Sequence, residues 1–409
     1  MWFYIIGFFA LTAIIFMYFV RAYHRDSESQ NAPLPFIVLN PYFGFGFRSG
    51  LTPKEFLEPS GRIDELLHPH GNGSWLDIKA NVLGFWSRHP FPYAPEKDEL
   101  VIGIVGGSVA QWHSLQSGAL LEHILSKELD RKVTILTFAM GGMKQPQQGQ
   151  IVSYLFQTGQ KLDLILNIDG FNEIVFNVRN KARDLDSTWP SIHMLGLVNT
   201  LVNSTVLNQN MLRTFLEIAR CRRISNTVIS LKKRRHLAPI RPVLIWLERR
   251  LIIHESNLRQ LLENNQSGSE KKLIAFPKPF QSEPESEPVQ QWGRSSLFLN
   301  GLTSSLAKQY IHIRQPHFSW GHKAMTDKEV ALMNIGAEAA SLASKYQSGL
   351  DLKAKELVAK GVNFVDATHI FDAVTETVYC DSAGHLNQRG NDILARFIAT
   401  QIAPLLAKP

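Results

Sequence analysis

A serine, a histidine and an aspartate stand where they could form a nucleophilic centre. Ser108 follows an apolar run that ends in Val-Gly-Gly, and a helical pattern begins after it. Asp381 and His385 lie four positions apart, just before the last helical pattern. An imidazole can take the proton of a serine hydroxyl, and a carboxylate can orient that imidazole. These residues predict covalent catalysis, although Gly-Gly-Ser would also suit a plain helix N-cap.

Two further segments could stabilise negative charge. Gly142 follows a second apolar run, and Asn172 follows a third. A backbone N–H and a side-chain amide aimed at one point form an oxyanion hole, which acyl transfer requires. Each residue alone would be an ordinary loop residue, so the prediction depends on their meeting Ser108.

A parallel sheet would bring these segments together. Five short apolar runs have the length and β-branched content of buried strands: residues 100–105, 133–138, 163–168, 309–313 and 362–365. Helical patterns at 115–129 and 147–160 separate the first three, and another helix is expected from Thr326, as N-cap, towards Tyr346. Alternating strands and helices indicate a parallel sheet covered on both faces, with its active site at the carboxyl edge.

The four blocks together resemble the SGNH (GDSL-like) hydrolase superfamily, over residues 100–176 and 306–405. The resemblance implies an α/β fold, a flavodoxin-like three-layer sandwich with a parallel five-stranded sheet. It also implies roles: Ser108 as nucleophile, His385 as base and Asp381 as its orienting acid. The backbone N–H groups of Ser108 and Gly142 and the side chain of Asn172 would be the oxyanion donors.

The chain departs from the family pattern at three places. Gly107 replaces the usual Asp before the serine, and Glu173 replaces an Asp after Asn172. The usual Asp-x-x-His has become Asp-x-x-x-His, so the contact of Asp381 with His385 is the least secure assignment. Asp366, Asp372 or a backbone carbonyl could orient the imidazole instead.

The first twenty residues form a candidate membrane anchor. Residues 1–20 contain no charge, and a helix of that length spans about 30 Å, the thickness of the bilayer core. The apolar run starts at the first residue, and RAYHRDSESQ follows it, which favours an uncleaved transmembrane helix over a signal peptide. We expect a single-pass membrane protein, and the sequence does not fix the side on which the catalytic domain lies.

A basic insertion separates the two halves of the predicted domain. Basic residues outnumber acids by 43 to 36 in the whole chain, and eleven of them lie between Arg213 and Arg250 beside only two acids. The cluster fits either a solvated helix face or a contact with anionic lipid headgroups. No nucleic-acid-binding module accompanies it.

These features divide the chain into five parts. They are a transmembrane anchor (1–20), a tether and irregular segment (21–99), the first part of the hydrolase domain (100–177), a helical basic insertion with a mobile linker running from about Asn264 to Ser296 (178–305), and the second part of the hydrolase domain (306–409). Residues 21–60 in particular read as the tether.

The predicted function is a membrane-anchored serine esterase that hydrolyses an ester, such as an O-acetyl group on a carbohydrate or a lipid ester. O-acyl transfer to a polysaccharide and a non-catalytic membrane-tethered scaffold are the alternatives. No cofactor or metal is expected, since only two cysteines are present and His68 and His70 lack a third ligand.

Overall fold

The centre of the molecule is a five-stranded parallel sheet. The computed structural model describes residues 36–60, 63–66, 73–183, 185–191, 194, 209–232, 234–269 and 287–407. The strands are β3 (Leu100–Gly106), β4 (Val133–Ala139), β5 (Leu164–Asp169), β6 (Gln309–Arg314) and β7 (Asn363–Asp366). Their order is β4-β3-β5-β6-β7, so all five predicted strands are confirmed. This order is flavodoxin-like, and it reverses between β3 and β5.

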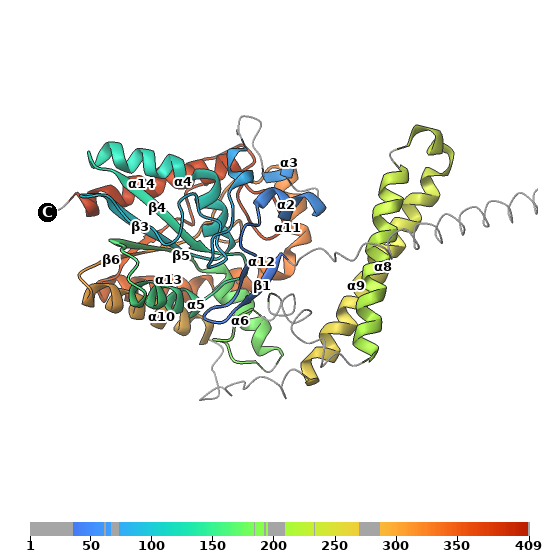
Figure 1. The fold of residues 1–409 in the computed structure, drawn as a ribbon, viewed down its shortest axis with the longest axis horizontal. Coiled ribbons are helices and arrows are strands. Elements are labelled where there is room, and N and C mark those ends of the chain that lie inside the picture. Colours follow the sequence, from blue (N-terminus) through green and yellow to red (C-terminus); the bar gives the residue numbers. More distant parts are fainter. Residues whose placement is uncertain are drawn as a thin grey trace, which may run out of the picture. The chain divides into compact units, whose positions relative to one another are not determined.

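Helices cover both faces of the sheet (Figure 1). On one face lie α4 (Ser108–Glu128) and α14 (Gln388–Leu406), and on the other lie α5 (Gln147–Gln157), α10 (Glu287–Ser305) and α13 (Gln347–Ala359). The helix α6 (Phe171–Lys181) packs against α10. Because both faces are covered, every residue of β3, β4 and β5 is buried, which explains their continuous apolar runs.

The segment before β3 is more than a tether. It contains β1 (Ile37–Asn40), β2 (Gly44–Phe47), α2 (Pro53–Leu57), η1 (Glu58–Ser60), α3 (Ile63–Leu66) and η2 (Ser74–Asp77). Its aromatic side chains pack onto the sandwich: the rings of Phe85 and Phe138 are 5.9 Å apart, as are those of Trp86 and Trp112. The predicted tether, residues 21–60, is wrong over residues 36–60, because Phe43, Phe45 and Phe47 are buried and burial of their rings outweighs the turn-rich composition; residues 21–35 lie outside the described residues.

The insertion is helical, as predicted. It contains α8 (Gln209–Lys232), η3 (Arg235–Ile240) and α9 (Arg241–Ser269), and α8 packs against α9. The predicted mobile linker is wrong at its C-terminal end, because α10 begins at Glu287. Trp292 of α10 is fully buried, and its indole N–H donates to Asp169 at 2.7 Å. Burial of this ring holds α10 in place, although the polar, Pro-rich sequence before Trp292 is typical of a loop.

The helix expected after Thr326 is divided in two. Thr326 is the N-cap and forms a capping box with Glu329, as predicted. The helix α11 (Asp327–Ile335) ends at Gly336, and α12 (Ala337–Lys345) begins after it. A side chain at Gly336 would meet the carbonyl oxygen of Ser382, so the break allows α11 to approach the loop that carries His385.

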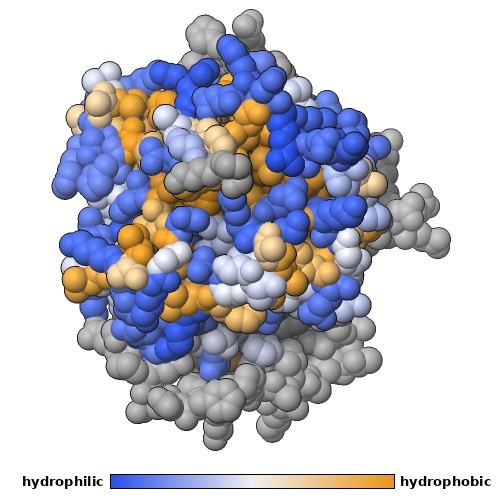
Figure 2. All heavy atoms as spheres, turned by 90° about the vertical axis from the view of Figure 1, so that its left-hand side faces the viewer, coloured by the Kyte–Doolittle hydropathy of each residue, from blue (hydrophilic) through white to orange (hydrophobic). Residues whose placement is uncertain are grey.

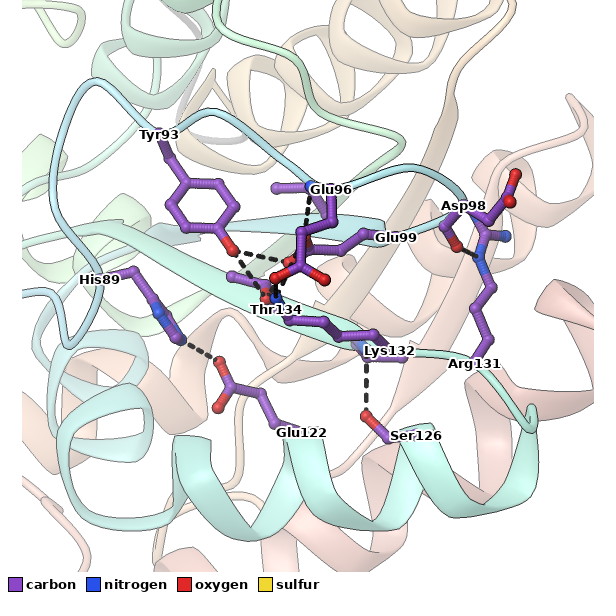
Figure 3. A network of polar contacts seen from close by, with 12 residues as sticks. His89, Tyr93, Glu96, Asp98, Glu99, Glu122, Ser126, Arg131, Lys132 and Thr134 are labelled. Atoms are coloured by element: carbon purple, nitrogen blue, oxygen red, sulfur yellow. Dashed lines mark hydrogen bonds and ion pairs between the residues drawn. The ribbon is translucent and has the colours of Figure 1, made fainter.

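A polar cluster fastens the chain at the amino edge of the sheet (Figure 3). His89 bonds to Glu122 at 2.7 Å, and the Tyr93 hydroxyl donates to Glu99 at 2.7 Å. Burial opposes ionisation of Glu99, but hydrogen bonds from Thr134 and Tyr93 outweigh it and lower its pKa to about 2. The cluster holds the segment before β3 at the edge opposite the carboxyl ends of the strands.

On the side where α14 ends, hydrophobic patches are interspersed with hydrophilic residues (Figure 2). Among the described helices, none combines the length and the apolarity that crossing a bilayer requires. The predicted anchor, residues 1–20, lies outside the described residues.

Candidate active site

The turn between β3 and α4 presents Ser108 at the carboxyl edge of the sheet. β3 ends at Gly106, Gly107 is the N-cap, and Ser108 is the first residue of α4. The first N–H groups of a helix have no partner within it, and they carry the positive end of the helix dipole. The serine hydroxyl therefore lies beside a backbone N–H that can bind developing negative charge.

His385 connects Ser108 to Asp381. Its Nε2 lies 2.6 Å from the Ser108 Oγ, and its Nδ1 lies 2.6 Å from the Asp381 Oδ2. An ionised carboxylate only accepts hydrogen bonds, so Nδ1 carries the proton and Nε2 accepts the serine hydroxyl. The imidazole and carboxylate are 16% and 13% exposed, so the centre reaches solvent. The three predicted residues form one hydrogen-bonded chain.

The lengthened Asp-x-x-x-His segment closes into a compact loop. The Asp381 Oδ1 accepts the N–H groups of Ala383 at 3.0 Å and of His385 at 3.2 Å. Gly384, with a φ of +75°, donates its N–H to the Asp381 carbonyl at 3.2 Å. The N–H of Cys380 donates to the His385 carbonyl at 2.9 Å. This turn absorbs the additional residue, so the longer spacing does not separate the carboxylate from the imidazole.

The other acids considered for this role are engaged elsewhere. Asp366 accepts the N–H and the hydroxyl of Thr368, and Asp372 accepts the N–H of His322 at 2.7 Å.

Within the described residues, no three or more His, Cys, Asp or Glu side chains are grouped as metal ligands. His68 and His70 lie outside those residues.

The two residues predicted as oxyanion donors, Asn172 and Gly142, lie in the loops next to the turn at Ser108. The Asn172 Nδ2 donates to the Met143 carbonyl at 2.8 Å, and a carboxamide has a second N–H to offer. The N–H of Gly141 is occupied by the Gln111 Oε1 at 2.7 Å. The N–H of Gly142 forms no hydrogen bond to the described residues, which leaves it available.

A buried acid, Glu173, links the loop after β4, which contains Gly142, to the turn after β5, which precedes Asn172. Its Oε2 accepts the N–H of Gly170 at 2.8 Å, and its Oε1 accepts the N–H of Gln145 at 3.1 Å and the Gln148 side chain at 3.3 Å. The Gln145 side chain also donates to Asp169 at 3.1 Å. Both acids are fully buried. They fix the loop after β4 against the turn after β5, which are the two segments that carry the donors.

These two acids carry different charges. Burial, and then the charge of Asp169, raises the pKa of Glu173 to about 8. Burial opposes ionisation of Asp169 too, but the charge of His312 and hydrogen bonds outweigh it and lower its pKa. Glu173 is therefore neutral, and Asp169 ionised, at neutral pH. In the sequence, Glu173 stands out only as a departure from the family pattern. The signal that could have identified it is an acid adjacent to Asn172 and four positions after Asp169.

A second Ser-His-Asp chain lies inside the molecule. The Ser296 Oγ is 2.8 Å from the His312 Nδ1, and the His312 Nε2 is 2.7 Å from the Asp169 Oδ1. All three residues are at most 1% exposed. An ester substrate has no access to this serine, so the second chain is a structural network, whereas the chain of Ser108 can meet a substrate.

His317 packs against the loop that carries His385. It is fully buried, and its ring stacks on Phe171, which precedes Asn172, at 4.3 Å between centroids. Gly384 approaches the His317 ring so closely that a Cβ at Gly384 would stand 2.4 Å from the His317 Cδ2. Burial lowers the pKa of His317 to about 3, so the imidazole is neutral. His317 therefore separates the loop of His385 from the helix of Asn172.

Comparison with known proteins leaves the site as the main source of functional inference. No family model matches the sequence, and no curated protein is significantly similar to it. Among solved structures, the chain is similar to the acetylxylan esterase Axe2 from Geobacillus stearothermophilus, with 11% identity, 75% of this chain and 96% of the other covered, and a TM-score of 0.35. It is also similar to the lipase Lip_vut3 from a goat rumen metagenome, with 10% identity, 74% of this chain and 97% of the other covered, and a TM-score of 0.31. For LAE5, an α/β hydrolase from the metagenome of Lake Arreo, Spain, the identity is 10%, 76% of this chain and 97% of the other are covered, and the TM-score is 0.33. Similarity at this level carries no argument about activity.

Proposed function

We propose that the chain is an SGNH-type serine esterase that hydrolyses an ester through an acyl-serine intermediate. The observation that carries the proposal is the continuous hydrogen-bonded chain from the Ser108 Oγ through His385 to Asp381. This chain lies where the strand order reverses, which is where open α/β sheets bind their ligands. Unlike the buried chain of Ser296, this chain reaches solvent, so a substrate can meet its serine.

In the first half-reaction His385 acts as base and then as acid. Its Nε2 takes the proton of Ser108 while the Oγ attacks the ester carbonyl carbon. The N–H groups of Ser108 and Gly142 and the amide of Asn172 stabilise the oxyanion. When the intermediate collapses, the carbon–oxygen bond to the leaving group breaks, and His385 returns the proton to the departing alkoxide. The product is an alcohol and an acyl-serine.

Water completes the cycle. His385 deprotonates a water molecule that attacks the acyl carbon, and the same proton then restores the Ser108 hydroxyl as the acid leaves. Throughout, Asp381 accepts the Nδ1–H and stabilises the imidazolium. If a sugar hydroxyl replaced the water, the same residues would perform O-acyl transfer, so the products of a reaction with an acyl donor and a polysaccharide distinguish the two reactions.

The protein would act at a membrane. Residues 1–20 are the proposed anchor, and the substrate would be an O-acetylated carbohydrate or a lipid ester. Trp246 of α9 is exposed, and the guanidinium of Arg250 lies 5.6 Å from its ring centroid. The acids Glu248 and Glu255 are paired with basic residues of α8 and α9, while Arg249 and Arg250 and the apolar side chains of Ile252 and Ile253 are exposed on α9. This composition supports contact with anionic lipid.

Two experiments test these proposals. Purified Ser108→Ala should lose hydrolysis of p-nitrophenyl acetate, and equal rates in the variant and the parent would refute the esterase assignment. For the lipid contact, a chain that begins at residue 21 should float with vesicles containing anionic lipid and not with neutral ones. Reversal of charge at Arg249 and Arg250 should abolish flotation; equal partitioning into both kinds of vesicle contradicts the contact.

A further inference from the structure

A surface groove runs between α5 and α10, apart from the Ser108 centre. Its volume is about 660 Å³. Its lining includes three aromatic and five long polar side chains: Tyr42, Tyr154, Phe298, Gln145, Gln150, Gln157, Gln291 and Arg294. No carboxylate lines it. Concave surfaces that combine aromatic walls with a few polar groups are typical of small-molecule binding sites.

Two of the three aromatic side chains that line the groove are exposed to solvent. Within the described residues, three aromatic side chains are exposed, namely Tyr42, Trp246 and Phe298, and two of them line this groove. Tyr42 is 60% exposed and Phe298 is 55% exposed. The rings of Tyr42 and Tyr154 lie 4.6 Å apart and form a continuous wall. Opposite, Phe298 approaches Gly149 of α5. Core packing does not require rings in this position.

The polar side chains fit a hydroxyl-rich ligand. Gln150 and Gln157 stand on the exposed side of α5, and Ser153 lies between them. A carboxamide both donates and accepts hydrogen bonds, as a sugar hydroxyl does. The C–H face of a pyranose ring is apolar and can lie against an aromatic ring, while its hydroxyls bond to the amides. An acyl chain would use the rings and leave the glutamines unsatisfied.

The groove starts near the catalytic edge of the sheet. Gln145 lines its inner end and donates to Asp169, the last residue of β5. From there the lining follows α5 from Gly149 to Gln157, a rise of about 12 Å at 1.5 Å per residue. We propose that this groove binds the carbohydrate chain that carries the scissile ester, as a subsite beyond the reacting sugar. The inference rests on the proposed esterase function and names its substrate class.

Binding can be tested without turnover. The Ser108→Ala protein is titrated calorimetrically with xylohexaose, cellohexaose, chitohexaose and hexagalacturonate, and at least one should bind. Adding Phe298→Ala or Gln157→Ala should weaken that binding about three- to tenfold, as loss of one stacking or polar contact does. Leu352→Ala is the control, since Leu352 is 69% exposed on α13 and lies outside the groove. Absence of binding by all four, or equal affinity with the Phe298 and Leu352 variants, overturns the proposal.

Turnover separates this inference from the esterase assignment. We expect Phe298→Ala to lower the ratio of kcat/KM for the acetylated form of the hexasaccharide that binds to kcat/KM for p-nitrophenyl acetate, through a higher KM for the saccharide. If Ser108-dependent hydrolysis exists but this ratio is the same in the Phe298 and Leu352 variants, the subsite is wrong and the esterase stands. If p-nitrophenyl decanoate is affected instead, the groove binds acyl chains and the proposal fails. If no Ser108-dependent hydrolysis exists, the esterase assignment fails and calorimetry alone decides the groove.

Discussion

Gly107 and Asn172 lie closer together than a side chain at position 107 would permit. A Cβ at Gly107 would stand 2.2 Å from the Asn172 Nδ2 and 3.1 Å from the Met143 carbonyl that this amide bonds. The Gly107 backbone is extended, with φ near −89°, so the requirement for glycine is steric. The contact places the Asn172 amide directly against the residue before Ser108, and it explains why no aspartate precedes Ser108 here.

Gly107→Ala should therefore act as an oxyanion-hole variant. We expect kcat to fall by about 10²–10³, as for loss of one oxyanion donor, because the new methyl group displaces the Asn172 amide. Asn172→Ala should give a similar loss, and the double variant should add little to either. Gly301→Ala is the control, since a Cβ there meets no neighbour. Multiplicative losses in the double variant would show that the two residues act independently.

Asp381→Asn tests the lengthened loop. The substitution keeps the size of the side chain but removes the acceptor that fixes the Nδ1–H tautomer, so kcat should fall about 10²–10⁴-fold with little change in KM. Asp372→Asn is the matched control, because Asp372 bonds to His322 and His369 and not to His385. If kcat falls more in the Asp372 variant than in the Asp381 variant, Asp372 is the acid that orients His385.

The sequence was informative where one local rule decides the structure. Buried parallel strands are continuous apolar runs, and a glycine-rich turn at a strand end needs no tertiary information, so the sheet and Ser108 could be predicted. Asp381 was less certain, because spacing alone cannot show that a turn at Gly384 returns the chain. Glu173 and Ser296 were missed as network members, since the partners that connect them to other segments, Gln145 for Glu173 and His312 for Ser296, are more than a dozen residues away. The segment from residue 36 and α10 were underestimated for the same reason: their aromatic side chains are buried by tertiary contacts that composition does not reveal.

Gly384→Ala should disturb the base loop. Its φ of +75° disfavours any side chain, and the new Cβ would collide with the His317 ring. We expect about 1–2 kcal/mol lower stability from the backbone alone and a larger fall in kcat as His385 shifts. Combining it with His317→Ala removes the collision, so kcat should partly recover while the strain remains. Denaturant unfolding and steady-state kinetics measure the two effects, and no recovery in the double variant would mean that backbone strain alone is responsible.

The two Ser-His-Asp chains should respond oppositely to a serine-directed probe. An alkyl fluorophosphonate should label Ser108 and leave Ser296 unmodified, because Ser296 is fully buried. Ser296→Ala should retain labelling and lower stability by about 1–3 kcal/mol, since it leaves a buried His312 nitrogen unpaired. Intact-protein mass spectrometry of the parent, Ser108→Ala and Ser296→Ala gives the result directly. If the Ser108→Ala variant is still labelled, Ser108 is not the nucleophile.

Glu173 should make the folded state less stable as pH rises. Its pKa is about 8 in the folded protein against 4.5 as the ordinary value, so between these pH values the folded state retains a proton that the unfolded state has lost. Stability then falls with increasing pH, by on the order of 1.4 kcal/mol per pH unit at most. His113 and His317, with pKa values lowered to about 4 and about 3 from 6.5, act in the opposite direction and still contribute near pH 6.5. They contribute equally to the parent and to Glu173→Gln, so the difference between the two profiles isolates Glu173. Glu173→Gln cannot ionise, and urea unfolding at pH 6.5, 7.25 and 8 should show a flatter profile than the parent. Parallel profiles would mean that Glu173 is ionised in the folded protein, with its three N–H donors outweighing burial.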